Sequence, residues 1–464
     1  MEAKRTACEE CRKVKERCSF PVDDRESQTC CRCQRLGKPC FTAAKSRTGR
    51  PRKLNDISTV PRTGAQFVWS PCDIPASNQA AVPKIAPGDM VFMEFIFRES
   101  TFVESFTLDP VFSQGMLTHL FESVHIAPAF LSDVFVACGK RYFKIHFGDS
   151  SGDGEIAFEN SARAVRALRK ASEQIDLVIV LTLGLGIITF DLMTSGLHAH
   201  EVCRFTLFAA STLQTPSVGS AGILSGLYLP FYFLDAFNCI IKRQIPVTKG
   251  PNKNNGDVDQ YMGVCAPLLP HLYKMCAISP SLKYSTSPEH THQLKAQLTH
   301  LEHNVRAWTP SLPAVHSNLI SPRLSRIMVM QARIHRAALL LVIHRLQHPF
   351  GTSDSTALGM ARNILSQIDT IYEPSISTSP SNFESPPSEY RLNFPFLVAA
   401  VEIMDEGERQ VVLNKASTVV SKRLYNNLER MLEVFLEYVW MRRDGGGGGV
   451  WFDWVAEGPP VVIF

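Results

Sequence analysis

The sequence predicts a chain of two unlike parts, a small cysteine-rich domain with two short helices followed by an all-α domain with long loops. Seven of the 13 cysteines fall within the first 40 residues. The first 54 residues hold 15 Lys and Arg against 7 Asp and Glu, a net charge of +8; the other 410 hold 33 against 37, a net charge of −4. From residue 90 onward, apolar residues recur with helical spacing and seldom alternate as in strands.

Composition sets the boundaries between these parts. Residues 1–54 form the basic, cysteine-rich domain. Residues 55–89 contain five prolines among small and polar residues and are predicted to be a linker. Residues 90–464 form the helical domain.

The amino terminus lacks the apolar core of a secretory signal, so we expect a reducing compartment in which disulfides are rare. Two uncharged apolar stretches test for a membrane span. Residues 177–190 are shorter than the roughly 20 residues that a span requires, and residues 205–234 are interrupted by polar residues, glycine and proline. Both are predicted to be buried helices, and no membrane partner is expected.

The amino-terminal cysteines form two half-sites of the same spacing, C-x-x-C followed by six residues and a third cysteine. Three sulfurs leave each tetrahedral zinc one ligand short, so six cysteines hold two ions if two of them bridge both metals. A seventh cysteine, Cys31, lies too close to Cys33 for the same turn and is predicted to be a bystander. The expected ligands are Cys8, Cys11, Cys18, Cys30, Cys33 and Cys40.

Other uses of these thiols fit less well. A disulfide framework requires export, and a redox C-x-x-C requires a strand-to-helix context that the sequence does not show. Zinc fingers that use histidine are excluded, because the first histidine of the chain is His119.

The stretches "ACEECRKVKERC" (7–18) and "CRCQRLGKPC" (31–40), with Cys30 just before the second, closely resemble the fungal binuclear zinc-cluster DNA-binding domain. The resemblance implies a nuclear protein that binds double-stranded DNA and carries two zinc ions per chain. It also implies that the first and fourth cysteines, Cys8 and Cys30, are the bridging ligands.

The segment between Cys11 and Cys18 is rich in cations and is predicted to be a helix that can enter a major groove. In the resembled family this helix reads a CGG triplet, and the base-reading cation aligns with Lys15. Contacts to phosphate are expected from Arg12, Lys13, Arg17, Arg32, Arg35 and Lys38.

A basic segment, "KSRTGRPRKL" (45–54), follows the last cysteine of the cluster. Its core resembles the AT-hook, in which Arg50 and Arg52 would enter a narrow A·T minor groove. It fits equally well a nuclear import signal, or a solvated tail that adds only counterion release.

Four segments of the helical domain are predicted as helices. Residues 162–174 open a helical run that becomes wholly apolar after Asp176. Residues 294–308 carry an apolar stripe of about two heptads, which indicates core packing, since a coiled coil needs three or four. Residues 323–347 and 415–443 are the other two. The glycine run 445–449 is interpreted as a flexible insert.

The helical domain shows no phosphate-binding loop, nucleophile elbow or zinc-protease motif. "GLG" at 184–186 is interpreted as helix packing. His344 and His348 share a helical face, but no third ligand is near in sequence, so they are predicted to be structural, as are His198 and His200.

Three segments, "ALLLVIHRLQHPFG" (338–351), "NFPFLVAAVEI" (393–403) and "WMRRD" with "WFDW" (440–454), resemble the helical regulatory domain of fungal zinc-cluster transcription factors. The resemblance implies a two-zinc DNA-binding domain joined to an all-α regulatory domain, in a protein that is not an enzyme. The expected partners are CGG-containing promoter DNA and the transcription machinery, with binding as a monomer or as a homodimer formed through the helical domain.

Many members of the resembled family with this layout control a biosynthetic gene cluster, and activators are the more common kind. The resemblance therefore implies an activator of such a cluster, with the helical domain masking or presenting an activation surface. Two alternatives stay open at this point. One is an architectural binder of AT-rich DNA, and the other is an enzyme with an appended zinc module.

Overall fold

The computed structural model of the chain describes residues 30–36, 87–98, 107–148, 153–170, 176–213, 221–250, 258–312, 320–372, 391–420 and 426–463. The chain divides into two compact units, Met1–Asn78 and Gln79–Phe464. Of the first unit, the structure describes residues 30–36. The division falls within the segment 55–89 that the sequence predicts as a linker, and the first described helix of the second unit begins at Pro87.

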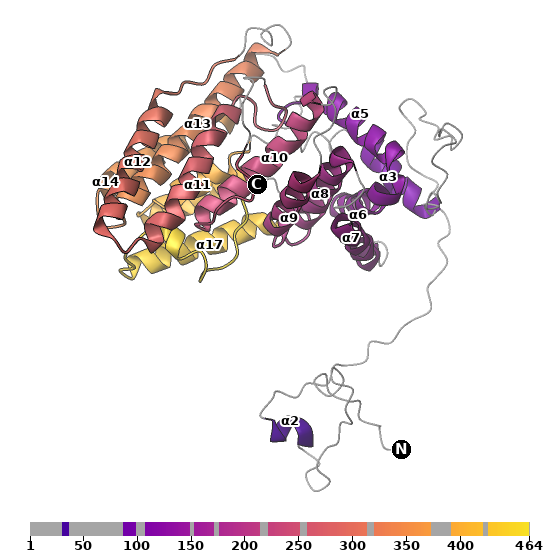
Figure 1. Cartoon of the computed structure of the whole chain (residues 1–464), viewed down its shortest axis with the longest axis horizontal. Helices are drawn as coiled ribbons and strands as arrows, with labels where there is room; N and C mark the ends of the chain where they lie inside the picture. The colour runs from indigo at the N-terminus through magenta and orange to yellow at the C-terminus, as the bar shows by residue number, and fades with distance from the viewer. Residues whose placement is uncertain are drawn as a thin grey trace. The chain divides into compact units, whose positions relative to one another are not determined.

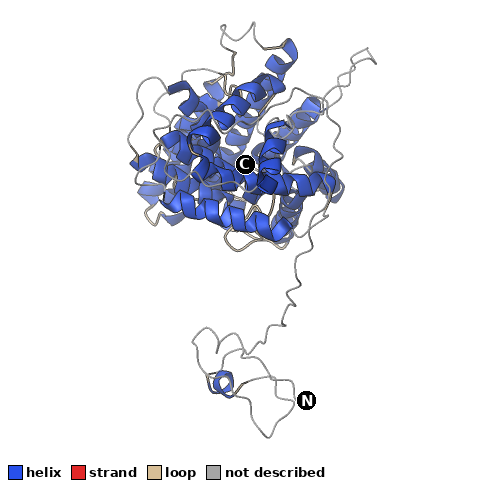
Figure 2. Ribbon diagram, turned by 90° about the vertical axis from the view of Figure 1, so that its right-hand side faces the viewer, coloured by secondary structure: helices blue, strands red, loops and turns tan. Residues whose placement is uncertain are grey.

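The described residues form helices joined by turns and loops, with no β-strand apart from an isolated bridge between Asp259 and Gly263 (Figure 2). The prediction of an all-α domain is therefore confirmed for this part of the chain. The α-helices are α2 (Cys31–Arg35), α3 (Pro87–Arg98), α5 (Pro110–Ile126), α6 (Pro128–Phe147), α7 (Asp153–Lys170), α8 (Leu177–Leu192), α9 (Ala199–Thr212), α10 (Ala221–Ile241), α11 (Leu269–Tyr284), α12 (Pro288–Ala307), α13 (Pro322–Gln347), α14 (Asp354–Tyr372), α15 (Asn393–Ala400), α16 (Glu406–Val419) and α17 (Asn426–Asp444). Two short 3-10 helices, Ala266–Leu268 and Trp451–Asp453, complete the set.

Several helix starts follow directly from the sequence. An Asp or Ser precedes the first turn, and its side chain accepts a backbone N–H that has no partner within the helix. In α5, α12 and α13 a proline follows at the first helical position, where its missing N–H costs nothing. These N-cap residues are Asp109, Asp176, Ser287, Ser321 and Asp405.

The second unit contains two groups of helices with α10 between them (Figure 1). On one side, α10 packs against α8 and α9, which continue through α6 to α3 and α7. On the other side, α10 packs against α11, which continues through α12 and α13 to α14 and α15. The described parts of the apolar stretches 177–190 and 205–234 therefore lie in α8, α9 and α10, whose described residues are mostly buried, as predicted. Residues 214–220 of the second stretch lie outside the described residues.

Helix α8 crosses its neighbours at the two glycines of the "GLG" segment. A Cβ at Gly184 would lie 2.4 Å from Thr206 of α9, and a Cβ at Gly186 would lie 2.8 Å from Val134 of α6. Both positions are too close for a side chain, so the glycines allow three helices to meet. The interpretation of this segment as helix packing is confirmed.

Helix α3 is attached to α6 by aromatic contacts and one ion pair. The Phe95 ring lies 5.6–5.9 Å from the rings of Tyr142, Phe143 and Phe147. Lys140, which is buried, reaches Asp89 at 2.7 Å. The first described helix after the linker is thereby held on the helical unit.

Helix α13 is the one described helix that is long and apolar enough to cross a membrane by length and composition. It also carries buried polar side chains, Gln331, His335 and Arg345, and it packs against α12, α14 and α15. These features are those of a core helix. Its predicted range of 323–347 is confirmed, as is the core role of the stripe on α12, where Leu294, Leu298, Leu301 and Val305 are buried.

The single helix predicted over residues 415–443 is wrong, because α16 ends at Val419 and α17 begins at Asn426. Val420 has an extended backbone, with φ −95° and ψ 117°. The preceding residues include the β-branched Thr418 and Val419, and the Ser417 hydroxyl donates to the Asn414 carbonyl at 3.1 Å. Both features weaken a helix at this point. The run from residue 162 is likewise divided, since α7 ends at Lys170 and α8 starts after Asp176.

The glycine run 445–449 is not the flexible insert that the sequence predicts. The N–H groups of Gly445, Gly446 and Gly447 donate to carbonyls in the last turn of α17, each at 3.0 Å. Gly446 and Gly449 have φ values of 80° and 90°, which favour glycine. The run therefore ends α17 and turns the chain towards Trp451.

We predict that Gly184→Ala lowers the free energy of unfolding by about 1–3 kcal/mol, because the added methyl group must displace Thr206. The control is Gly359→Ala on α14, where a Cβ meets no atom within 4 Å. It should stabilise by about 0.5–1 kcal/mol through the lower backbone entropy of the unfolded chain. Urea unfolding of both variants checks this, and equal effects would contradict the close packing at Gly184.

Candidate functional site

In the amino-terminal unit, two of the expected zinc ligands lie on one turn of backbone. Cys30 is the N-cap of α2, and its Sγ accepts the backbone N–H of Cys33 at 3.4 Å. Both side chains are fully buried, whereas Cys31 is exposed. The thiols at the ends of the C-x-x-C turn are thus enclosed together, and the thiol between them points to solvent.

Two of the expected DNA-contacting cations also lie on α2. Arg35 is exposed and Arg32 is partly exposed. The remaining sequence-predicted site residues lie outside the described part of the chain: Cys8, Cys11, Arg12, Lys13, Lys15, Arg17, Cys18, Lys38, Cys40, Arg50 and Arg52.

In the helical unit, the three segments singled out from the sequence meet at one buried ionic cluster. Arg345 of α13 donates to both carboxylate oxygens of Glu402, just beyond α15, at 2.9 and 2.5 Å. Arg345 is 1% exposed and Glu402 is fully buried. Arg443 of α17 donates to the backbone carbonyls of Val401 and Glu402 at 3.3 and 3.0 Å. One buried carboxylate therefore connects three helices.

Phe350 completes this cluster. The guanidinium groups of Arg345 and Arg443 lie 4.6 and 4.4 Å from the centre of its ring, and the ring stacks on Trp454 at 5.5 Å. Its backbone N–H donates to the Gly449 carbonyl at 2.9 Å. The aromatic face lowers the cost of keeping two guanidinium groups close together.

The pKa values of the two arginines in the cluster shift in opposite directions. Burial opposes the charge of Arg345, but hydrogen bonds to Glu402 and Asp354 outweigh it and raise the pKa of Arg345. Burial lowers the pKa of Arg443, which reaches the Glu402 carboxylate only at 3.9 Å. The cluster is thus centred on the bidentate pair of Arg345 and Glu402.

His344 and His348 do not form a metal site with other described residues. Their rings lie 4.7 Å apart, and the Nε2 atom of His344 lies 3.4 Å from the Ser353 carbonyl oxygen. Within the described ranges, the one group of three side chains with metal-ligand geometry is His200, Asp235 and Cys239, all buried. The sequence predicts a structural role for His200, and its spacing does not pair this residue with the other two.

The helical unit thus brings the three expected segments into mutual contact around a buried ionic cluster. The model of one family, the fungal specific transcription factor domain, matches residues 221–464, which is more than half of the chain. The chain therefore belongs to this family of transcription regulators, whose members are typically not enzymes.

The match begins at α10, so helices α3 to α9 lie outside it, whereas the sequence predicts one regulatory domain over residues 90–464. No zinc-cluster family model matches the amino-terminal part of the chain. No curated protein and no solved structure matches the sequence. The family places the protein among regulators that act in the nucleus with DNA or the transcription machinery.

We predict that Glu402→Gln lowers the free energy of unfolding by about 3–5 kcal/mol, because it removes the buried bidentate counter-charge of Arg345 and leaves only the partly exposed Asp354. The control is Glu408→Gln, which breaks an exposed pair with Arg362 at 2.8 Å and should cost about 0–1 kcal/mol. Urea unfolding provides both values. Similar losses in the two variants would show that burial does not set the strength of the central pair.

Proposed function

We propose that the chain is a sequence-specific regulator of RNA polymerase II transcription that binds CGG-like triplets through an amino-terminal binuclear zinc cluster. The observation that carries this proposal is the duplicated cysteine spacing, together with a helical domain of the transcription factor family. The burial of Cys30 and Cys33 with Cys31 outside supports it, because sulfur ligands of zinc are enclosed and a bystander thiol is not.

Six thiolates are donors that suit zinc, and the two described ones fit such a site. Zinc would fix the fold of the cysteine-rich unit, and the cations around it would contact DNA. Lys15 would donate to guanine O6 and N7. Arg12, Lys13, Arg17, Arg32, Arg35 and Lys38 would neutralise phosphates and position the unit without reading sequence.

We predict that the full-length chain loses about two zinc ions on Cys33→Ser, because a binuclear cluster with shared sulfurs does not survive the loss of one ligand. The matched control is Cys31→Ser, which should keep the full zinc content, since Cys31 is exposed. Metal analysis by mass spectrometry gives the counts. Zinc loss in the Cys31 variant, or none in the Cys33 variant, would refute the ligand set.

We predict that Lys15→Ala weakens binding to a CGG site by about 1–3 kcal/mol and relaxes the preference for that triplet. Arg50→Ala should weaken binding to all sequences alike, as loss of a phosphate contact does. Binding of both variants to selected and scrambled oligonucleotides tests this division. If selection from random DNA enriches AT-rich sites without CGG, the architectural mode of binding would hold instead.

At the level of pathway, we propose an activator of a biosynthetic gene cluster, on the basis of the family resemblance. Genome-wide occupancy of the chain, combined with transcript levels in a deletion strain, identifies the genes. A rise in target transcripts on deletion would make the protein a repressor.

A further inference from the structure

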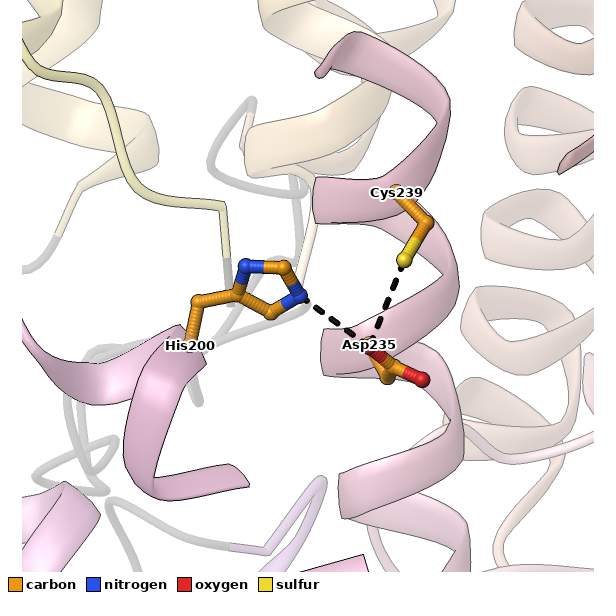
Figure 3. A group of neighbouring side chains, drawn as sticks. All are labelled: His200, Asp235 and Cys239. Carbon is orange, nitrogen blue, oxygen red and sulfur yellow. Dashed lines mark hydrogen bonds and ion pairs between the residues drawn. The ribbon is translucent and has the colours of Figure 1, made fainter. Parts of the chain in front are cut away.

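A compact group of three donor side chains lies between α9 and α10 (Figure 3). His200 is on α9, and Asp235 and Cys239 are one turn apart on α10. The Nε2 atom of His200 lies 3.1 Å from Oδ1 of Asp235, and Cys239 Sγ lies 3.3 Å from the same oxygen. The three donor atoms all lie within 4.8 Å of one another.

The spacing and chemistry of these atoms suit a tetrahedral metal ion. Zinc bonds of about 2.0–2.3 Å place neighbouring ligand atoms about 3.3–3.6 Å apart, close to the two distances from Asp235 Oδ1. Nitrogen, carboxylate oxygen and thiolate sulfur are the donors of zinc sites, and three of them leave a fourth position for water. A neutral His with two anionic ligands also balances the charge of a divalent ion, which a buried site requires.

Two cationic side chains, those of Arg204 and Lys242, contact this group. Arg204 Nη1 lies 3.4 Å from Asp235 Oδ1 and 3.2 Å from Cys239 Sγ, and it also donates to the Ile245 carbonyl at 3.1 Å. Lys242 Nζ lies 3.3 Å from Nδ1 of His200. Arg204 thus compensates the carboxylate at the place where a metal ion would bind.

The site has one side open to exchange. Asp235 and His200 are at most 2% exposed, but the Arg204 side chain is 33% exposed. Arg204 can therefore turn outward into solvent and uncover the three ligands. The second oxygen of Asp235 accepts the Val247 N–H at 3.0 Å and keeps the carboxylate oriented towards the group.

A nucleophilic role for Cys239 is not supported by the arrangement. Its neighbour is the Asp235 carboxylate, and His200 contacts the same carboxylate from another direction, so no base is positioned on the thiol. Burial raises the pKa of Cys239, which also disfavours a free thiolate.

We propose that His200, Asp235 and Cys239 form a regulatory site for a divalent metal ion of the zinc type, which Arg204 closes in the absence of metal. The site is separate from the amino-terminal cysteines and goes beyond the proposed DNA-binding function. On binding, the metal displaces the Arg204 guanidinium from Asp235 and Cys239.

Metal binding also moves protons at the site. The Cys239 thiol loses its proton to solvent as the sulfur–metal bond forms. The His200 ring proton moves from Nε2, which binds the metal, to Nδ1, so the ring stays neutral. Lys242 then faces an N–H donor and must turn away. Metal binding therefore weakens as the pH falls.

The exchange also has a mechanical consequence. Arg204 connects the ligand group to the Ile245 carbonyl, and Asp235 connects it to the Val247 N–H. When Arg204 leaves, the segment 243–250 keeps only the second of these two contacts with the ligand group. The metal thus alters the chain directly after α10, at the start of the family-matched domain.

The test uses the full-length chain with Zn²⁺ measured by mass spectrometry, and with Co²⁺ as a probe whose sulfur charge-transfer absorption reports thiolate ligation. We expect about three ions per chain, two in the cluster and one here. Cys33→Ser should remove the two cluster ions and keep the third, and Cys239→Ser and Asp235→Asn should each remove only the third. The proposal about the cluster and the proposal about this site therefore fail independently.

The decisive variant is Arg204→Met, which removes the competing cation and keeps all three ligands. It should tighten binding of the third ion by about tenfold or more, the scale of effects from neighbours of metal ligands. The control is Arg306→Met, which removes an exposed cation of α12 and should change nothing. If the Arg204 variant, folded by circular dichroism, binds no third ion, the group is a closed hydrogen-bond network and the proposal is overturned.

Discussion

The buried pair of Arg345 and Glu402 is the interaction on which the family-matched domain depends. A buried ion pair adds little net stability compared with apolar packing, but loss of either partner leaves an uncompensated charge in the core. The pair therefore specifies which helices must meet. Glu402 fixes the end of α15 on α13, and its backbone carbonyl fixes α17 through Arg443.

α10 itself carries a second buried charge that depends on its partners. Asp235 is the one charged residue between positions 205 and 241, and it is fully buried. Burial alone would raise the pKa of Asp235, but hydrogen bonds from His200 and the Val247 N–H lower it. Glu402 and Asp235 are thus two buried carboxylates, each paired with an arginine. One arginine is almost wholly enclosed and the other reaches solvent, which is why we assign a structural role to one and an exchangeable role to the other.

The sequence predicted what depends on short-range order. The apolar stripe of α12 is a local pattern, and the helices α12 and α13 appeared where expected. The three segments 338–351, 393–403 and 440–454 were also identified, but not that they meet at one carboxylate. A lone charge in a long apolar run, as at Glu402 or Asp235, was the available signal. Its partner lies 57 positions away in one case and 35 in the other, so no periodicity reveals it.

The break after Val419 was missed for a different reason, since the apolar spacing continues across it while the β-branched residues oppose the helix.

The glycine run acts as a spacer of defined length. Five identical residues suggest a tract that can grow or shrink without effect, as simple repeats often do. Here the first glycines close the end of α17 and the last one presents its carbonyl to Phe350, while Trp451, two residues later, is fully buried. One glycine more or fewer would shift the register between α17 and this tryptophan, so the count of five is part of the fold.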